Sequence, residues 1–188
     1  MPFFSFLDDN SGVGDVMVHD PERYLPIGTF TQDLLRGPSP FSVAERELIA
    51  AYVSGLNQCQ FCHGAHSKVA AGLGVDRGLF AKLLDDVDRA PVAEKLKAVL
   101  RYVKTLTLAP SRLTQADADA VFAAGWDEQA LGDAVAICAL FNLYNRIVEG
   151  HGIKGNAAYF ERVSGFIAQQ GYEARTRQAL EAKLRKSA

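Results

Sequence analysis

The chain has 188 residues, of which 48% are hydrophobic and 22% are charged, and its formal net charge is −2. These values are typical of a folded domain and argue against a disordered chain. No dense basic stretch precedes the C-terminal tail, so nucleic acid is not an expected partner. The first residues lack the basic start of a secretory signal, and no run approaches the roughly 20 apolar residues of a membrane helix. We therefore expect a cytoplasmic protein with no membrane partner, folded as a single domain over residues 1–188.

Helix signals follow one another along the chain. Residues 1–19, with three phenylalanines and a Gly-rich patch, predict irregular structure. Asp20 and Pro21 predict the start of a helix that ends near Arg36, because Asp is a favoured N-cap and Pro a favoured first helical residue. Further helices are expected at 42–56, at 59–72 with the cysteines, at 76–84, 91–109, 114–123 and 127–149, and at 156–170, followed by a charged tail or arm at 171–188. No alternating strand pattern occurs, so the sequence predicts an all-α bundle of seven or eight helices. It excludes a thioredoxin fold, in which C-x-x-C follows a strand.

The helix expected after Asp127 is apolar on nearly every side over residues 134–148. Such a helix is buried in the core or in a subunit interface. We expect Cys138 to lie in the core, and Arg146 and Glu149, charged residues near the core, to be paired. Several wide apolar faces and the N-terminal aromatic residues have no obvious place in one bundle. The sequence therefore predicts a homo-oligomer, at least a dimer, with the termini and part of a central helix at the interface.

The residues that carry chemistry gather between Glu47 and His66, in the stretch ELIAAYVSGLNQCQFCHGAH. Cys59 and Cys62 form a C-x-x-C pair, and His66 follows Cys62 by four residues. On a helix these intervals place the three side chains on one stripe. A helix N-terminus under the cysteines and a nearby imidazole would each favour a thiolate. Glu47, on the preceding helix, could fold back to hold His66 and complete a proton relay.

Two other interpretations of this stretch stay open. Cys59 and Cys62 could be small buried apolar residues, since free cysteine is among the most buried residue types. With His66 they could also ligate zinc, but structural zinc needs a fourth ligand. His63 points about 100° away from Cys62 on a helix and is a poor candidate for that position. No metal is therefore expected.

The glutamate, C-x-x-C and histidine at these offsets resemble the alkyl hydroperoxide reductase D (AhpD) / carboxymuconolactone decarboxylase family. The stretch VSGLNQCQFCHGAH, at 53–66, is similar to the peroxidase-related branch of that family. The core resemblance covers about residues 40–90, and FNLYNRIVEGHGI at 141–153 looks like a later helix of the branch. In the founding enzymes a histidine directly precedes the second cysteine. Here that position holds Phe61, and His63 follows the second cysteine instead.

The resemblance implies roles for four residues. Cys62 would attack a peroxide, and Cys59 would resolve the resulting sulfenic acid into a disulfide. His66 and Glu47 would move protons. The implied activity is antioxidant reduction of hydrogen peroxide or alkyl hydroperoxides, with a thiol or protein reductant and without metal, flavin or haem. The relatives look like dimers, trimers or hexamers.

Two other functions remain as alternatives. One is a reaction of the carboxymuconolactone decarboxylase type, although those relatives do not depend on a C-x-x-C pair. The other is a non-catalytic dithiol that exchanges disulfides with another protein. Consumption of peroxide by the purified protein would separate them.

Overall fold

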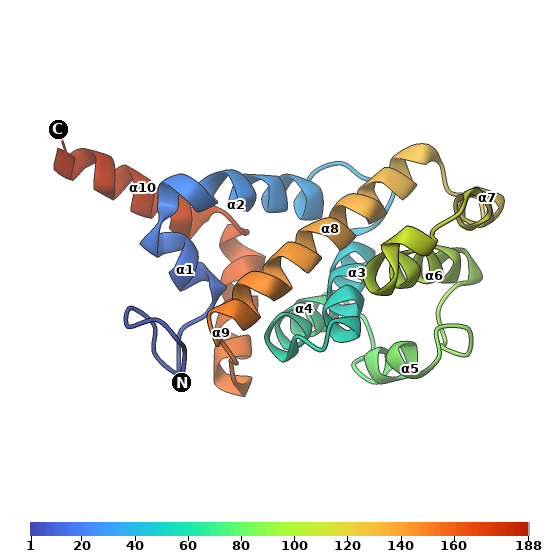
Figure 1. Cartoon of the computed structure of the whole chain (residues 1–188), viewed down its shortest axis with the longest axis horizontal. Helices are drawn as coiled ribbons and strands as arrows, with labels where there is room; N and C mark the ends of the chain where they lie inside the picture. The colour runs from blue at the N-terminus through green and yellow to red at the C-terminus, as the bar shows by residue number, and fades with distance from the viewer. Residues whose placement is uncertain (188) are drawn as a thin grey trace.

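The computed structural model describes residues 1–187, and these contain ten α-helices, one 3-10 turn and no strand (Figure 1). The helices are α1 (Val13–His19), α2 (Pro21–Arg36), α3 (Val43–Leu56), α4 (Gln60–Gly72), α5 (Leu79–Asp85), α6 (Glu94–Leu108), α7 (Gln115–Ala123), α8 (Glu128–Gly150), α9 (Ala157–Gln170) and α10 (Ala174–Ser187), and the 3-10 turn is η1 (Pro110–Arg112). The prediction of an all-α fold is confirmed. The helices outnumber the predicted seven or eight because α1 forms within the expected irregular leader and α10 within the tail.

Side-chain caps begin several helices where the sequence predicted them. Asp20 caps α2 through the backbone N–H of Arg23. Ser42 caps α3 in a capping box, and Asp127 accepts from the backbone N–H of Ala130 at 2.8 Å at the start of α8. At the start of α7, Asp117 accepts from the backbone N–H of the N-cap Thr114 at 2.8 Å. Each such cap satisfies an N–H group that would otherwise lack an intrahelical partner. The starts predicted at Asp76 and Pro91 are wrong by about one turn, since α5 begins at Leu79 and α6 at Glu94.

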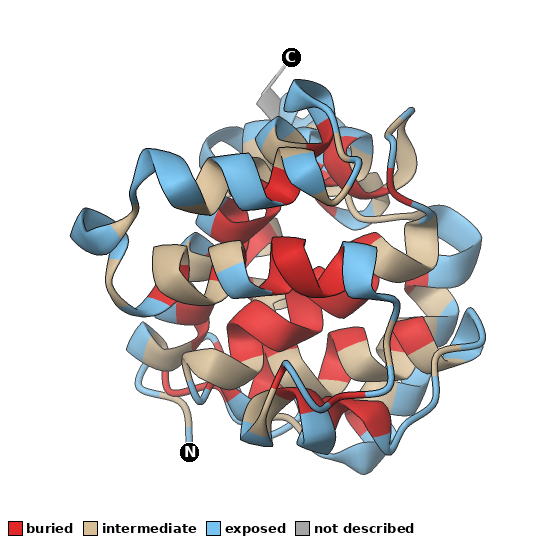
Figure 2. Cartoon of the chain, turned by 90° about the vertical axis from the view of Figure 1, so that its right-hand side faces the viewer, coloured by how far each residue is buried: buried red, intermediate tan, exposed pale blue. Residues whose placement is uncertain are grey.

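The long helix α8 lies at the centre of the bundle and packs against α2, α3, α4 and α6. Its buried face carries Ile137, Phe141 and Cys138, which confirms the expected core position of that cysteine. Among the described residues α8 is the one helix long and apolar enough to cross a membrane by length and composition alone. Core helices often have this composition. Figure 2 shows buried residues concentrated on these inner helices.

The predicted pairing of Arg146 with Glu149 near the core is wrong. Arg146 is exposed and donates through Nη1 to the carbonyl and side-chain oxygens of Asn142, at 2.9 and 2.7 Å. Glu149 instead accepts from Lys154 at 2.9 Å. The last turn of α8 still buries Val148 in the core, whereas Arg146 lies on the outward side of the helix, where water solvates its charge.

The two ends of the chain lie together on one side of the bundle. Helix α10 packs against α1 and α2, and α9 packs against α4 (Figure 1). Gly64 allows the α4–α9 approach, because a Cβ there would lie 2.6 Å from the Phe160 ring. As a result α1, α9 and α10 cover the face of α4 that carries the cysteine–histidine stripe.

Candidate active site

The turn between α3 and α4 sets the position of Cys59. Gln58 has a φ of 58°, which is uncommon for a residue other than glycine. The backbone N–H of Cys59 donates to the carbonyl of Ser54 at 2.9 Å. From α8, Asn145 accepts from the Asn57 amide at 2.8 Å and donates to the Ser54 hydroxyl at 3.1 Å. The central helix therefore holds this turn in place, and Cys59 stands as the N-cap of α4.

Cys59 and Cys62 are free thiols, both buried, with exposed fractions of 0% and 3%. A hydrogen bond from the Cys62 thiol, with help from the Cys62 backbone N–H, lowers the pKa of Cys59, although burial and Glu149 oppose the shift. The same hydrogen bond, together with burial, raises the pKa of Cys62 well above its usual range. These shifts favour ionisation of Cys59 over ionisation of Cys62.

Glu47 lies behind His66 and is fully buried. One carboxylate oxygen is 2.7 Å from Nδ1 of His66. The other is 2.6 Å from a guanidinium nitrogen of Arg36 and accepts from the hydroxyl of Tyr172 at 2.5 Å. The expected contact between Glu47 and His66 is thus present, but it belongs to a larger group of four side chains.

The charge of Glu47 is stabilised inside the protein. Burial alone would raise the pKa of this carboxyl group, since it disfavours the charged form. Attraction to His66 and Arg36, with hydrogen bonds from His66 and Tyr172, outweighs burial and lowers the pKa of Glu47. Glu47 is therefore a carboxylate that orients the imidazole, as second groups do for histidines that transfer protons.

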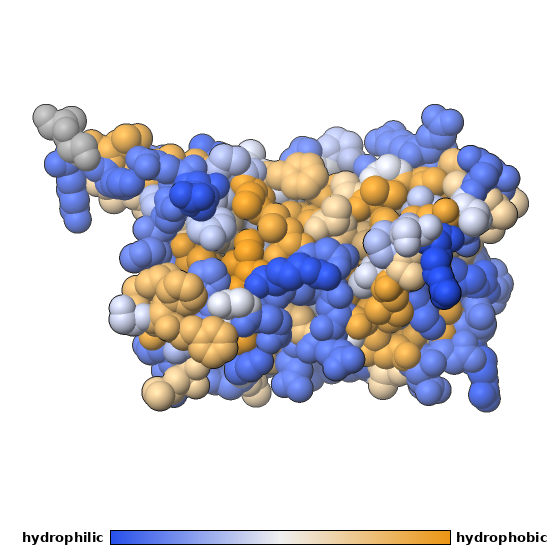
Figure 3. Space-filling model, in the orientation of Figure 1, coloured by the Kyte–Doolittle hydropathy of each residue, from blue (hydrophilic) through white to orange (hydrophobic). Residues whose placement is uncertain are grey.

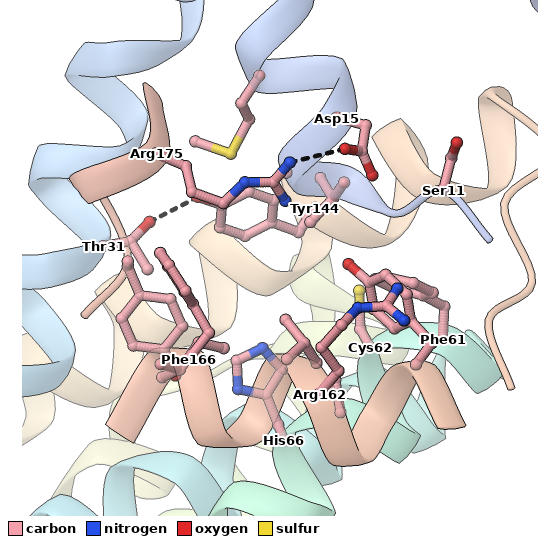
Figure 4. Close-up of a pocket in the computed structure, with 18 of the residues that line it drawn as sticks. Ser11, Asp15, Thr31, Phe61, Cys62, His66, Tyr144, Arg162, Phe166 and Arg175 are labelled. Carbon is pink, nitrogen blue, oxygen red and sulfur yellow. Dashed lines mark hydrogen bonds and ion pairs between the residues drawn. The ribbon is translucent and has the colours of Figure 1, made fainter. Parts of the chain in front are cut away.

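A cavity of about 520 Å³ lies between α4 and the two chain ends, and both Cys62 and His66 face it (Figure 4). The wall from the bundle also includes Phe61, Phe141 and Tyr144. The opposite wall comes from the N-terminal segment, α1, α9 and α10. Cys59 and Glu47 do not line the cavity, so each lies behind the residue it contacts.

The four residues predicted from the sequence thus lie in two layers. Cys62 and His66 border the cavity, while Glu47 contacts His66 from behind and Cys59 is buried at the N-cap of α4. Within residues 1–187 no hydrogen bond is formed between His66 and Cys62. His63 points elsewhere, with Nδ1 at 2.9 Å from the carbonyl of Ala51.

Sequence reasoning missed three residues of this site. Asn145 lies in the stretch FNLYN, whose looser resemblance to the family could have indicated it. Arg36 and Tyr172 carried no local signal, because each reaches Glu47 from a distant element. In the part of the chain that the structure describes, no three His, Cys, Asp or Glu residues lie close enough together to hold a metal ion.

Known proteins resemble this chain in sequence and in fold. Residues 25–105 match the model of the carboxymuconolactone decarboxylase family. A solved structure of an uncharacterized peroxidase-related protein from Silicibacter sp. TM1040 is similar, with 26% identity, a TM-score of 0.73 and coverage of 79% of this chain and 78% of that chain.

A second solved structure, an alkylhydroperoxidase AhpD core described as an uncharacterized peroxidase-related protein from Ralstonia eutropha JMP134, has 23% identity and a TM-score of 0.71. The match covers 77% of this chain and 76% of that chain. No curated protein matches the chain. Over residues 25–105 the chain is therefore similar to the carboxymuconolactone decarboxylase family, and its fold is AhpD-like.

Proposed function

We propose that the protein is a thiol-dependent peroxidase that reduces an organic hydroperoxide at Cys62 and forms a Cys59–Cys62 disulfide in each turnover. One observation carries the proposal: Cys62 borders a cavity of about 520 Å³, and Cys59 is buried three residues before it, at the N-cap of the same helix. A peroxide can meet the Cys62 sulfur there, and two cysteines at this spacing at a helix start can close a disulfide. The similarity to a peroxidase-related protein from Silicibacter sp. TM1040 supports the same class of reaction.

The first step uses the unequal ionisation of the two thiols. The Cys59 thiolate takes the proton of the Cys62 thiol, and the Cys62 sulfur attacks the outer oxygen of the hydroperoxide. The S–O bond forms as the O–O bond breaks, so the sulfur is oxidised by two electrons and the peroxide is reduced to an alkoxide. The Glu47–His66 pair supplies the proton that converts the alkoxide to an alcohol. Cys62 is left as a sulfenic acid.

The second step closes the disulfide. Cys59 attacks the sulfenic sulfur, and the S–O bond breaks with release of water. An external dithiol then returns two electrons and two protons through thiol–disulfide exchange, and Cys59 gives its proton back to the Glu47–His66 pair. Free thiols persist in reducing compartments, so the proposed cycle would run in the cytoplasm.

The burial of both thiols favours a small oxidant over a protein disulfide as the first reactant. With Cys59 at 0% and Cys62 at 3% exposure, a partner protein could not bring its own disulfide to either sulfur without moving α9 or α10. The cavity admits a small molecule without that movement. A dithiol whose only role is exchange with other proteins would need a more exposed sulfur.

The test is to mix the reduced protein with cumene hydroperoxide and to follow peroxide loss with dithiothreitol as the reductant. We expect turnover, and mass spectrometry of the protein without reductant should show one Cys59–Cys62 disulfide per chain. A protein that leaves the peroxide unchanged, or that stops at one turnover with a sulfinic acid on Cys62 and a free Cys59, would contradict the proposal.

A further inference from the structure

The cavity at Cys62 is much larger than hydrogen peroxide. Its volume is about 520 Å³, which corresponds to on the order of 15 water-sized groups at about 30 Å³ each. Ligand sites of this size usually hold an organic molecule and cover most of its surface. A substrate with a body of ten to fifteen non-hydrogen atoms, as a rough measure from the same volume, would fill this space.

Most of the wall is apolar, and it extends well beyond the cysteine. Apolar and aromatic side chains from three helices line it, namely Met17 from α1, Phe141 and Tyr144 from α8, and Phe166 and Ile167 from α9; Figure 4 labels Tyr144 and Phe166 among them. Contact with these side chains removes apolar surface of the ligand from water, which favours an aliphatic or aromatic body.

One cation at the edge of the cavity has no acidic partner among the described residues. Arg162 of α9 is exposed, lines the cavity, and lies over the Tyr159 ring at 5.2 Å from its centroid (Figure 4). Its one hydrogen bond, to the backbone carbonyl of Asn10, is long at 3.5 Å. Its guanidinium therefore keeps donors free for an anion.

The other charged side chains at the outer wall of the cavity already have partners. Arg175 binds Asp15 at 2.8 Å. Asp8 accepts from the hydroxyl of Ser11 and from the backbone N–H of Asn10, each at 2.9 Å. A ligand that carries a carboxylate would thus meet one available guanidinium, and planar guanidinium groups bind carboxylates through two parallel hydrogen bonds.

We infer that the cavity binds amphipathic carboxylic acids, with the carboxylate on Arg162 and the apolar body between α1, α4, α8 and α9. Under the proposed function, on which this step rests, the substrates are hydroperoxides of medium-length fatty acids. Arg162 then determines specificity and takes no part in the chemistry at Cys62.

The test separates binding from catalysis. Calorimetric titration with decanoate, which carries no peroxide, should show binding to the wild-type protein, and methyl decanoate should bind at least about tenfold more weakly because it lacks the charge-assisted hydrogen bonds. Arg162→Gln should abolish this difference. Arg177→Gln serves as the matched control, because Arg177 is exposed on α10, pairs with Glu173 and does not line this cavity.

The kinetic arm compares ω-hydroperoxydecanoate with its methyl ester. We expect Arg162→Gln to raise KM for the acid by about tenfold, to the value for the ester, whereas Arg177→Gln should leave KM for both substrates and the turnover of hydrogen peroxide unchanged. Equal binding of decanoate and its ester by the wild-type protein, absence of decanoate binding, or unchanged binding in Arg162→Gln would overturn the inference. Binding of decanoate without turnover of any hydroperoxide would instead reject the proposed function and leave the binding site standing.

Discussion

The two cysteines differ at the residue scale in their ionisation and in their position. Cys59 is the thiol that ionises more readily, whereas Cys62 is the thiol that a molecule in the cavity can reach. The pKa of Cys59 is lowered by its hydrogen bond from Cys62, whereas Cys62 is the sulfur that borders the cavity. A single cysteine could not combine both properties, since a buried thiolate without a donor is strongly disfavoured. In the proposed cycle, Cys59 and Cys62 share one proton, and the substrate can reach the sulfur of Cys62.

Substitution of each cysteine should separate these roles. Cys62→Ser removes the reacting sulfur, so we expect no reduction of cumene hydroperoxide. Cys59→Ser keeps that sulfur but removes the resolving thiol, so one equivalent of peroxide should be consumed and a sulfenic acid should remain on Cys62. Trapping with dimedone and mass spectrometry measure both results. If Cys62→Ser reacts once and Cys59→Ser does not react, the roles are reversed.

The dependence of the rate on pH should report the shared proton. Because the pKa of Cys59 is lowered, the thiolate form persists to lower pH than for an ordinary thiol, and the rate should reach its plateau below the usual thiol range near 8.5. In Cys59→Ser, burial keeps the pKa of Cys62 high, so the midpoint of the single-turnover rate should move to higher pH. Stopped-flow measurements across pH would show this. A midpoint that is the same in both proteins would refute the proton-sharing scheme.

The sequence was sufficient to predict the contact between Glu47 and His66. It was not sufficient to predict the hydrogen bond between Tyr172 and Glu47 or the order in which the two thiols ionise. Glu47 and His66 lie on consecutive helices joined by a short turn, so their 2.7 Å contact follows from local folding. Tyr172 is 125 residues from Glu47 in the chain, and their hydrogen bond depends on how α9 and α10 dock. The ionisation order of the thiols depends on burial and on the Cys62 thiol and backbone N–H, none of which has a signature in the spacing.

At the scale of elements, the connection between α9 and α10 contributes to a site whose other parts come from α2, α3 and α4. The Tyr172 ring stacks on His66 with a centroid distance of 6.0 Å, and its hydroxyl donates to Glu47. The Arg36 guanidinium lies 5.0 Å above the same ring. Tyr172 is therefore a positioning residue, which acts on the proton relay through Glu47.

Tyr172→Phe should reveal this role. Loss of a hydrogen bond to a buried charge should lower the free energy of unfolding by about 1.5–3 kcal/mol. The bond also helps to lower the pKa of Glu47, so without it the carboxylate is protonated at higher pH and the acidic limb of the peroxidase rate should move upward. Urea unfolding and the rate profile measure the two effects.

Tyr52→Phe is the matched control for this substitution. The Tyr52 hydroxyl is buried on α3 and has no hydrogen-bond partner among the described residues. Its removal therefore costs no hydrogen bond, and stability and the pH profile should be unchanged or stability should rise slightly. If Tyr172→Phe behaves like Tyr52→Phe in both measurements, the positioning role is wrong.

The starts of helices could be predicted where the sequence has a typical N-cap residue. Asp20, Ser42 and Asp127 each accept from a backbone N–H at a helix start, and Asp117 accepts from the backbone N–H of the N-cap Thr114. Helix α1 was not predicted, because its seven residues include a glycine and are too few to form a stable helix alone. It is held instead by packing against α2 and α10, and such long-range contacts leave no local pattern.

At the scale of the whole molecule, the chain ends enclose the reactive stripe of the inner helices. The matched family segment, residues 25–105, contains both cysteines, His66 and Glu47. The opposite cavity wall lies outside that segment, in α1, α9 and α10. Under the proposed function, the chemistry and the choice of substrate would reside in different parts of the chain, and substitutions in α9 should change KM before they change kcat.

Helix α8 also leaves an apolar stripe on the surface of the molecule. Gly132, Ala139 and Leu143 are exposed on one side of the helix, with Val135 and Ala136 half-buried between them, and Leu143 keeps 42% of its surface exposed. Figure 3 shows apolar residues on the face that α8 crosses. Apolar stripes of this kind are commonly covered by a second subunit, and a twofold dimer is the most frequent arrangement. We propose that two or more chains associate through this stripe.

Sedimentation velocity at micromolar concentration tests the association. We expect a mass that is a multiple of 20.4 kDa. Leu143→Glu should reduce the mass to that of one chain, because a carboxylate in an apolar interface loses its hydration without gaining a partner. Gln178→Glu adds the same charge to an exposed position on α10 and should leave the assembly intact. Both variants should keep the helical circular dichroism of the wild type, so a change in mass reports association alone. A wild-type mass of 20.4 kDa that stays constant on concentration would show that the α8 stripe remains open to solvent.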